Sequence, residues 1–157
     1  MKRILLSLLT LMMFSIVSAQ GYDTPAPASK PFNEQLAKEM GADDFGMRKY
    51  VMAFLKKGPN RPTDKDEATK LQAAHMENIG RLAKEGKLAL AGPFLDDGEL
   101  RGIYIFNVET IEEAKALTET DPAIKVGSLV MELHPWYGSA ALGFVAKYHD
   151  KLAKKKI

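Results

Sequence analysis

The stretch KLALAGPFLDDGELRGIYIFNV, residues 87–108, decides the fold. It contains two runs rich in Leu, Ile, Tyr and Phe, residues 87–94 and 100–108, separated by a short polar segment. Asp97 and Gly98 in that segment form a turn signal, because glycine adopts the backbone angles that a tight chain reversal needs. Two strand-like runs joined in this way predict an antiparallel hairpin.

Helical segments flank this hairpin in the sequence. A long one precedes it at residues 64–85, and either Asp64 or Thr63 is suited to cap its first turn. A shorter one follows at residues 111–119. We therefore expect a helix on each side of the hairpin in the chain order.

Two further strand-like runs complete the pattern, at residues 49–57 and 128–136. The order is β-α-β-β-α-β, which predicts an α+β protein with a ferredoxin-like antiparallel sheet and helices on one face.

In the last run, alternate residues point to opposite faces of the sheet, so the helices can cover only one set. The set expected under the helices is Leu129, Met131 and Leu133. The set expected on the other face is Val130, Glu132, His134 and Trp136. That second face requires either solvent or a second subunit, and we expect a homodimer.

The first 19 residues, MKRILLSLLTLMMFSIVSA, have the pattern of a secretory signal peptide. Lys2 and Arg3 form a basic start, residues 4–17 are uncharged and largely apolar, and a small residue, Ala19, ends the segment. The alternative is a membrane anchor, but the run is shorter than the roughly 18 apolar residues of a spanning helix. We therefore expect an exported protein, periplasmic or secreted, with no stable membrane anchor after cleavage.

Removal of residues 1–19 leaves 138 residues and lowers the formal net charge from +2 to 0. This balance does not indicate a nucleic acid partner. The absence of cysteine excludes thiol nucleophiles and cysteine-based metal sites. Residues 20–46 are predicted to form a Pro- and Ala-rich linker followed by a short helix at residues 33–40.

His75 lies at an unusual position in the long helix. Leu71, His75, Ile79 and Leu82 recur at helical spacing, so the imidazole belongs to the stripe that faces the core. Such a ring is either a packed side chain with one satisfied nitrogen or a general base that titrates near neutral pH. Asp121, followed by a proline, has the pattern of a helix N-cap.

Several stretches, in this order, resemble the YCII-related (YciI-like) domain family. They are GPN at 58–60, His75, EGKLALAGPFLDDGELRGIYIF at 85–106, EEAKAL at 112–117, TDPAIKVG at 120–127 and MELHPW at 131–136. The resemblance assigns residues 47–137 to a YCII-like domain and leaves residues 138–157 as a C-terminal helical tail.

This resemblance implies a dimeric α/β barrel with a site around His75 and Asp121. Related enzymes dehydrochlorinate or isomerise small ring compounds, with such a His or Asp in proton transfer and no organic cofactor. The expected function is therefore that of a small-molecule enzyme in which Asp121 orients His75. The alternative is a non-catalytic module that binds a small ligand or dimerises, with a structural His–Asp pair. The signal peptide and the extra segments at both ends depart from the usual small cytoplasmic member.

Other residues complete the predicted site. Those assigned to ligand binding are Gly92, Pro93, Phe94 and Trp136. The alternative, which is the commoner role of such residues, is a bulge or strand end for the first three and simple packing for Trp136. No metal is predicted, because Glu132 and His134 are only two potential ligands. The lysines at 154–156 are typical of a solvated tail, with binding to a membrane surface as the alternative.

We predict that the mature protein begins at or next to Gln20, because the small-residue positions of the cleavage site end at Ala19. Mass spectrometry of the protein isolated from its native host should show the corresponding loss of mass. Detection of intact residues 1–19 in that material would refute the prediction.

Overall fold

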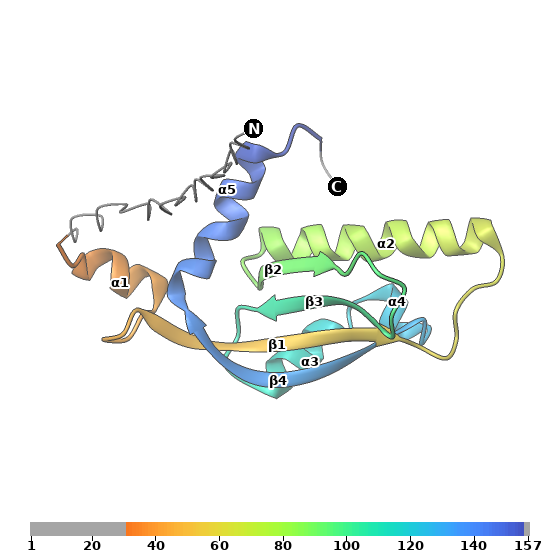
Figure 1. The fold of residues 1–157 in the computed structure, drawn as a ribbon, viewed down its shortest axis with the longest axis horizontal. Coiled ribbons are helices and arrows are strands. Elements are labelled where there is room, and N and C mark those ends of the chain that lie inside the picture. Colours follow the sequence, from red (N-terminus) through yellow and green to blue (C-terminus); the bar gives the residue numbers. More distant parts are fainter. Residues whose placement is uncertain (1–30, 156–157) are drawn as a thin grey trace, which may run out of the picture. The chain divides into compact units, whose positions relative to one another are not determined.

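The computed structural model describes residues 31–155, and the folded unit begins at Asn33. Its elements are α1 (Glu34–Met40), β1 (Met47–Lys57), α2 (Lys65–Lys84), β2 (Leu88–Pro93), β3 (Leu100–Phe106), α3 (Ile111–Thr118), α4 (Pro122–Lys125), β4 (Leu129–Ser139), the 3₁₀ helix η1 (Ala140–Phe144) and α5 (Val145–Leu152) (Figure 1). The predicted strand and helix order is confirmed. The predicted signal peptide, residues 1–19, lies outside the described residues.

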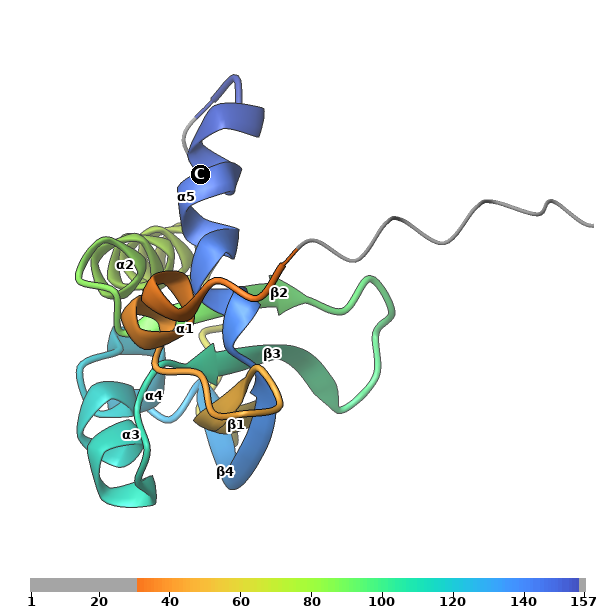
Figure 2. The same cartoon turned by 90° about the vertical axis from the view of Figure 1, so that its left-hand side faces the viewer.

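The four strands form one antiparallel sheet in the order β2-β3-β1-β4. This order places β1, the first strand in the sequence, in the interior of the sheet between β3 and β4, as the ferredoxin-like arrangement requires. Val51 of β1 is paired with Phe106 on one side and Pro135 on the other. Figure 2 shows α2, α3 and α4 together on one side of this sheet.

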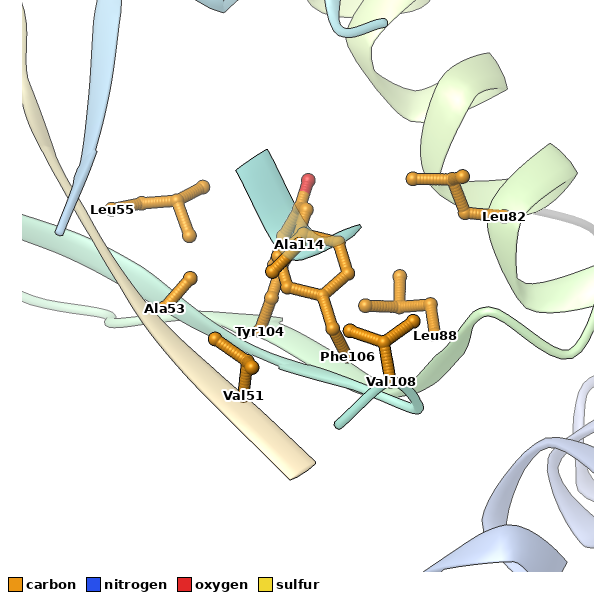
Figure 3. Packing of buried hydrophobic residues seen from close by; sticks show 9 residues of the cluster. All are labelled: Val51, Ala53, Leu55, Leu82, Leu88, Tyr104, Phe106, Val108 and Ala114. Carbon is orange, nitrogen blue, oxygen red and sulfur yellow. The ribbon is translucent and has the colours of Figure 1, made fainter. Parts of the chain in front are cut away.

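The main core lies between the sheet and these helices. Its buried members are Val51, Ala53, Leu55, Leu82, Leu88, Tyr104, Phe106, Val108 and Ala114 (Figure 3). Leu129, Met131 and Leu133 of β4 pack against this cluster, which confirms the predicted inward set. Because the core joins alternate residues of every strand to the helices, it determines which face of each strand points inward.

Local capping sets the helix boundaries. The side chain of Asp64 accepts a hydrogen bond from the backbone N–H of Glu67 at 2.9 Å, which selects Asp64 over its neighbour as the cap of α2. Thr110 and Glu113 form a reciprocal capping box at the start of α3. These short-range signals explain why the predicted boundaries agree closely with the structure.

The last strand is longer than predicted, because β4 continues to Ser139 and remains paired with the first residues of β1. Pro135 lies within it, which an edge strand tolerates because its outer N–H groups have no strand partner. Strand β4 therefore extends beyond Trp136, where the sequence pattern placed its end.

The other sheet face is only partly covered. Near the ends of β1 and β4, Tyr50 and Trp136 pack with Leu142, which η1 supplies. Farther along β4, Val130 is 45% exposed. The chain's own C-terminal segment thus covers one part of the face predicted for dimerisation and leaves another part open. None of the helices within residues 31–155 has the length and apolar character that crossing a bilayer requires.

Two glycines join the end of β1 to the segment before β4. The N–H of Gly58 donates to the Ser128 carbonyl at 2.9 Å, and that of Asn60 donates to the Gly127 carbonyl at 3.0 Å. A Cβ atom at Gly58 would lie 2.1 Å from the Gly127 carbonyl oxygen, so this backbone contact requires glycine. Gly127 itself has a φ of 75°, which also favours glycine.

Candidate functional site

Helix α2 places His75 on its inner face, where only 7% of the residue is exposed. The same face carries Leu82, a member of the main core, two turns farther along. Leu71, one turn before His75, lies instead in the wall of a surface hollow. His75 therefore occupies the boundary between the packed core and a hollowed part of the surface.

Asp121 is fully buried and serves two structural purposes. Its Oδ1 accepts the backbone N–H of Ala123 at 2.9 Å, which caps α4. Its Oδ2 lies 2.7 Å from Nδ1 of His75. The two residues that the sequence analysis singled out are thus in direct contact across 46 positions of the chain.

These contacts determine which ring nitrogen of His75 is basic. The carboxylate of Asp121 can only accept a hydrogen bond, so Nδ1 carries the hydrogen and donates it. In the neutral ring Nε2 is then the acceptor, and it lies 3.4 Å from the hydroxyl of Tyr104, which donates to it. The rings of His75 and Tyr104 are stacked with centroids 6.3 Å apart. Asp121, His75 and Tyr104 therefore form a continuous polar chain inside an apolar core.

Tyr104 was not identified from the sequence. It belongs to β3 and is 2% exposed, with its ring against Phe106 in the core. Burial, and secondarily the negative charge of Asp121, raises the pKa of its phenol well above the ordinary value. The available signal was an inward-facing tyrosine in an apolar strand, since a buried hydroxyl needs a polar partner.

A hydrogen-bond network of Asn78, Arg81 and Thr120 fixes the segment before Asp121. The hydroxyl of Thr120 lies 3.0 Å from the side-chain oxygen of Asn78, and Arg81 donates to both of these oxygens. Asn78 follows His75 by three residues on α2, so both residues contact the same connection between α3 and α4. The amide nitrogen of Asn78 is buried and has no hydrogen-bond partner within residues 31–155. This network holds Asp121 opposite α2.

A hollow opens beside the pair. A cavity of about 90 Å³ lies between the first turns of α2 and the start of β4, and it is bordered by Leu71, Ala123 and Leu129. It adjoins a wider and more open hollow of about 620 Å³ that shares Arg61 and Leu71 in its wall. Ala123 is the residue whose N–H binds Asp121. The walls of both hollows leave out His75 and Asp121, so the pair lies behind them.

Comparison with known proteins identifies the domain that holds this pair. The profile of the YCII-related domain matches residues 50–137, more than half of the chain. The chain belongs to the YCII-related domain family.

Two known proteins illustrate the likeness. The uncharacterized protein YjpA of Bacillus subtilis (strain 168) is 33% identical over 64 residues, which cover 41% of this chain and 73% of YjpA. Among solved structures, the 5-chloro-2-hydroxyhydroquinone dehydrochlorinase TftG of Burkholderia phenoliruptrix AC1100, in complex with 2,5-dihydroxybenzoquinone, aligns with a TM-score of 0.42 and 22% sequence identity. That alignment covers 55% of this chain and 92% of TftG. The similarity to TftG assigns no reaction to this chain.

The residues predicted to bind a ligand lie elsewhere in the YCII domain. Gly92 and Pro93 end β2, and Phe94 follows them with 39% of its surface exposed. Trp136 packs against Tyr50 on the sheet face opposite the helices. Their role in ligand binding stays a prediction.

Glu132 and His134 form a surface cluster on β4. Nε2 of His134 lies 2.8 Å from Glu132, whose other carboxylate oxygen is bound by Lys56. The hydrogen bond from Lys56, followed by that from His134, holds the pKa of Glu132 below its ordinary value. Within residues 31–155 no three potential ligands gather into a metal site.

The buried phenol of Tyr104 predicts a loss of stability at alkaline pH. Its pKa is raised in the folded state, so the unfolded chain releases this proton first, and unfolding becomes easier as pH rises above the ordinary value of about 10. The loss reaches about 1.4 kcal/mol per pH unit. In Tyr104→Phe this component is absent, so the difference in unfolding free energy between wild type and variant should change little from pH 9 to pH 10 and should shift in the variant's favour above about pH 10. The exposed Tyr148→Phe serves as the control in urea unfolding, and a Tyr104→Phe difference that is constant with pH would contradict the assignment.

Proposed function

We propose that this chain is an exported YCII-domain enzyme that acts on a small molecule, with His75 as the proton carrier. The observation that carries the proposal is the 2.7 Å contact between Nδ1 of His75 and Asp121, because it leaves Nε2 as the basic atom. The export part of the proposal rests on the signal-peptide pattern of residues 1–19.

Asp121 suits the task of orienting and stabilising the charged ring. A proton taken up at Nε2 creates an imidazolium, and the buried carboxylate beside Nδ1 stabilises that charge. The second oxygen of Asp121 is bound to the N–H of Ala123, so the carboxylate cannot rotate away from the ring without breaking the cap of α4. The geometry therefore supplies a base of fixed orientation.

The expected reaction class is elimination or isomerisation, in which a proton leaves a carbon atom next to an activating group. Tyr104 faces the basic nitrogen, and its raised pKa keeps the phenol protonated and able to donate a hydrogen bond. A substrate must therefore displace the Tyr104 hydroxyl from Nε2 or exchange protons through it. The hollow bordered by Leu71 and Ala123 adjoins the pair through Ala123, whose N–H binds Asp121.

A second candidate function is a small-ligand-binding module with a structural His–Asp pair. The specific observation in its favour is burial, since His75 is 7% and Asp121 is 0% exposed. In this case the ligand occupies the hollow near Arg61 and does not contact the imidazole.

Mutagenesis separates the two candidates once a thermal-shift screen has identified a ligand. For an enzyme, His75→Ala and Asp121→Asn each abolish turnover, and the double variant is little worse than either single one because the residues act as a unit. Asn at 121 can still accept the N–H of Ala123, so α4 stays capped. For a structural pair, truncation costs about 1–3 kcal/mol of stability while ligand binding survives. His149→Ala, at an exposed position of α5, is the control, and full turnover by His75→Ala would eliminate His75 as the proton carrier.

We also propose that the chain is a homodimer through the part of the sheet face that η1 leaves open. Phe54, Ile103 and Val130 alternate with inward-facing residues, and each is partly or largely exposed. Packing of this face against the same face of a second copy would remove these apolar side chains from water.

Light scattering at micromolar concentration should therefore give the mass of a dimer. Val130→Asp should shift the mass to that of a monomer, because it places a charge in the interface. Val126→Asp is a matched control, since Val126 is 48% exposed, close to the 45% of Val130, and lies at the end of α4. A monomeric wild type would refute the dimer.

A further inference from the structure

Helix α5 is amphipathic but contributes no buried residue to the fold. Its apolar residues Val145, Tyr148 and Leu152 recur at i, i+3 and i+7 and so share one side of the helix. Tyr148 is 55% and Leu152 is 82% exposed. The apolar side of α5 is therefore largely in contact with solvent.

The charges of α5 are arranged around this apolar side. At about 100° per residue, Lys147 and Lys151 lie along one edge of it, whereas Asp150 lies on the opposite side of the helix. Nζ of Lys151 is 5.5 Å from the ring centroid of Tyr148, so the ammonium group borders the apolar stripe. Such an arrangement allows long basic side chains to extend past an inserted apolar stripe.

The basic character continues past the helix at Lys154 and Lys155, which are exposed. No carboxylate within residues 31–155 forms an ion pair with any of the four lysines of this segment. Their positive charge is thus available to a negatively charged partner.

Helix α5 follows the YCII domain in the chain and lies next to its strand β2. The family match ends at residue 137, and α5 follows only after η1, whose Leu142 packs on the sheet. In Figure 2, the C-terminal end of α5 extends away from the sheet. The exposed Tyr148 and Leu152 belong to neither of the two core clusters of the fold.

We propose that α5 binds the surface of an anionic phospholipid membrane, with Tyr148 and Leu152 at the level of the headgroups and the lysines beside the lipid phosphates. Basic residues at the edge of a narrow apolar stripe, with the acidic residue opposite, complement such a surface. Two copies of α5 packed antiparallel, stripe to stripe, would instead bring the Lys147 and Lys151 edges of both copies together, which like-charge repulsion opposes. This surface is distinct from the proposed proton-transfer site.

Vesicle sedimentation tests the proposal with the chain from Gln20 onward, which contains the whole folded unit. The protein should sediment with vesicles of phosphatidylglycerol, should remain in solution with vesicles of phosphatidylcholine, and should be released as salt is raised. Leu152→Asp should weaken binding at least about tenfold, since it places a charge within the apolar stripe. Lys151→Glu should weaken it by at least about fivefold, because each basic residue near an anionic surface contributes roughly that factor.

Matched variants exclude general effects of charge. Leu95→Asp changes a leucine that is 99% exposed in the β2–β3 loop and should bind as the wild type does, as should Lys65→Glu at the start of α2. All variants should retain the wild-type thermal midpoint, because none changes a core residue. Equal sedimentation with both lipids, no sedimentation with either, or unchanged binding of Leu152→Asp would overturn the proposal. A change in oligomeric mass caused by Leu152→Asp, without lipid binding, would assign the stripe to a second copy instead.

Discussion

The hydrogen bond between His75 and Asp121 joins the middle of α2 to the N-cap of α4. Both side chains are almost completely removed from water, and the negative charge of Asp121 is compensated there by the imidazole N–H and the N–H of Ala123. If the imidazole is removed, the carboxylate loses one of these donors and remains buried. The packing of the helices on the sheet therefore depends on a polar contact as well as on apolar area.

The hydrogen bond between His75 and Asp121 also determines which nitrogen of the imidazole is basic. A fixed carboxylate orients the ring, and the orientation leaves one nitrogen basic. Tyr104 then closes the chain of polar groups from the sheet side. The His75 side chain is 9% and the Asp121 side chain 1% exposed, so the proposed proton transfer to a substrate would require a local movement that gives the substrate access to Nε2. A binding module needs no such motion.

Much of the fold could be predicted from the sequence because the sequence signals for its elements are local. The hairpin of β2 and β3 and the capping box of Thr110 and Glu113 depend on signals a few residues long and were predicted correctly. The tight turn predicted at Asp97 and Gly98 is instead a longer loop over residues 94–99, in which Gly98 does not adopt a positive φ. The inward position of His75 followed from helical periodicity.

The contact of His75 with Asp121 is different, because it spans 46 positions and only the resemblance to a family suggested it. Tyr104 was missed because its proximity to the imidazole depends on how α2 lies over β3, which no local pattern encodes. The placement of Leu142 on the sheet was missed for the same reason, since the path of the C-terminal segment is set by long-range packing.

The backbone contact between Gly58 and Gly127 supports the fold beside residues that border the open hollow. It is made by main-chain atoms, and the side chain of Arg61 adds a hydrogen bond of 3.4 Å to the Ser128 carbonyl. Asn60, Arg61 and Pro62 form a segment that borders the open hollow beside α2. If the hollow holds the proposed ligand, replacement of these side chains would alter which molecules it accepts, while the two glycines preserve the backbone contact beside it. Divergence of ligand preference among proteins with this domain is expected to concentrate in such a segment.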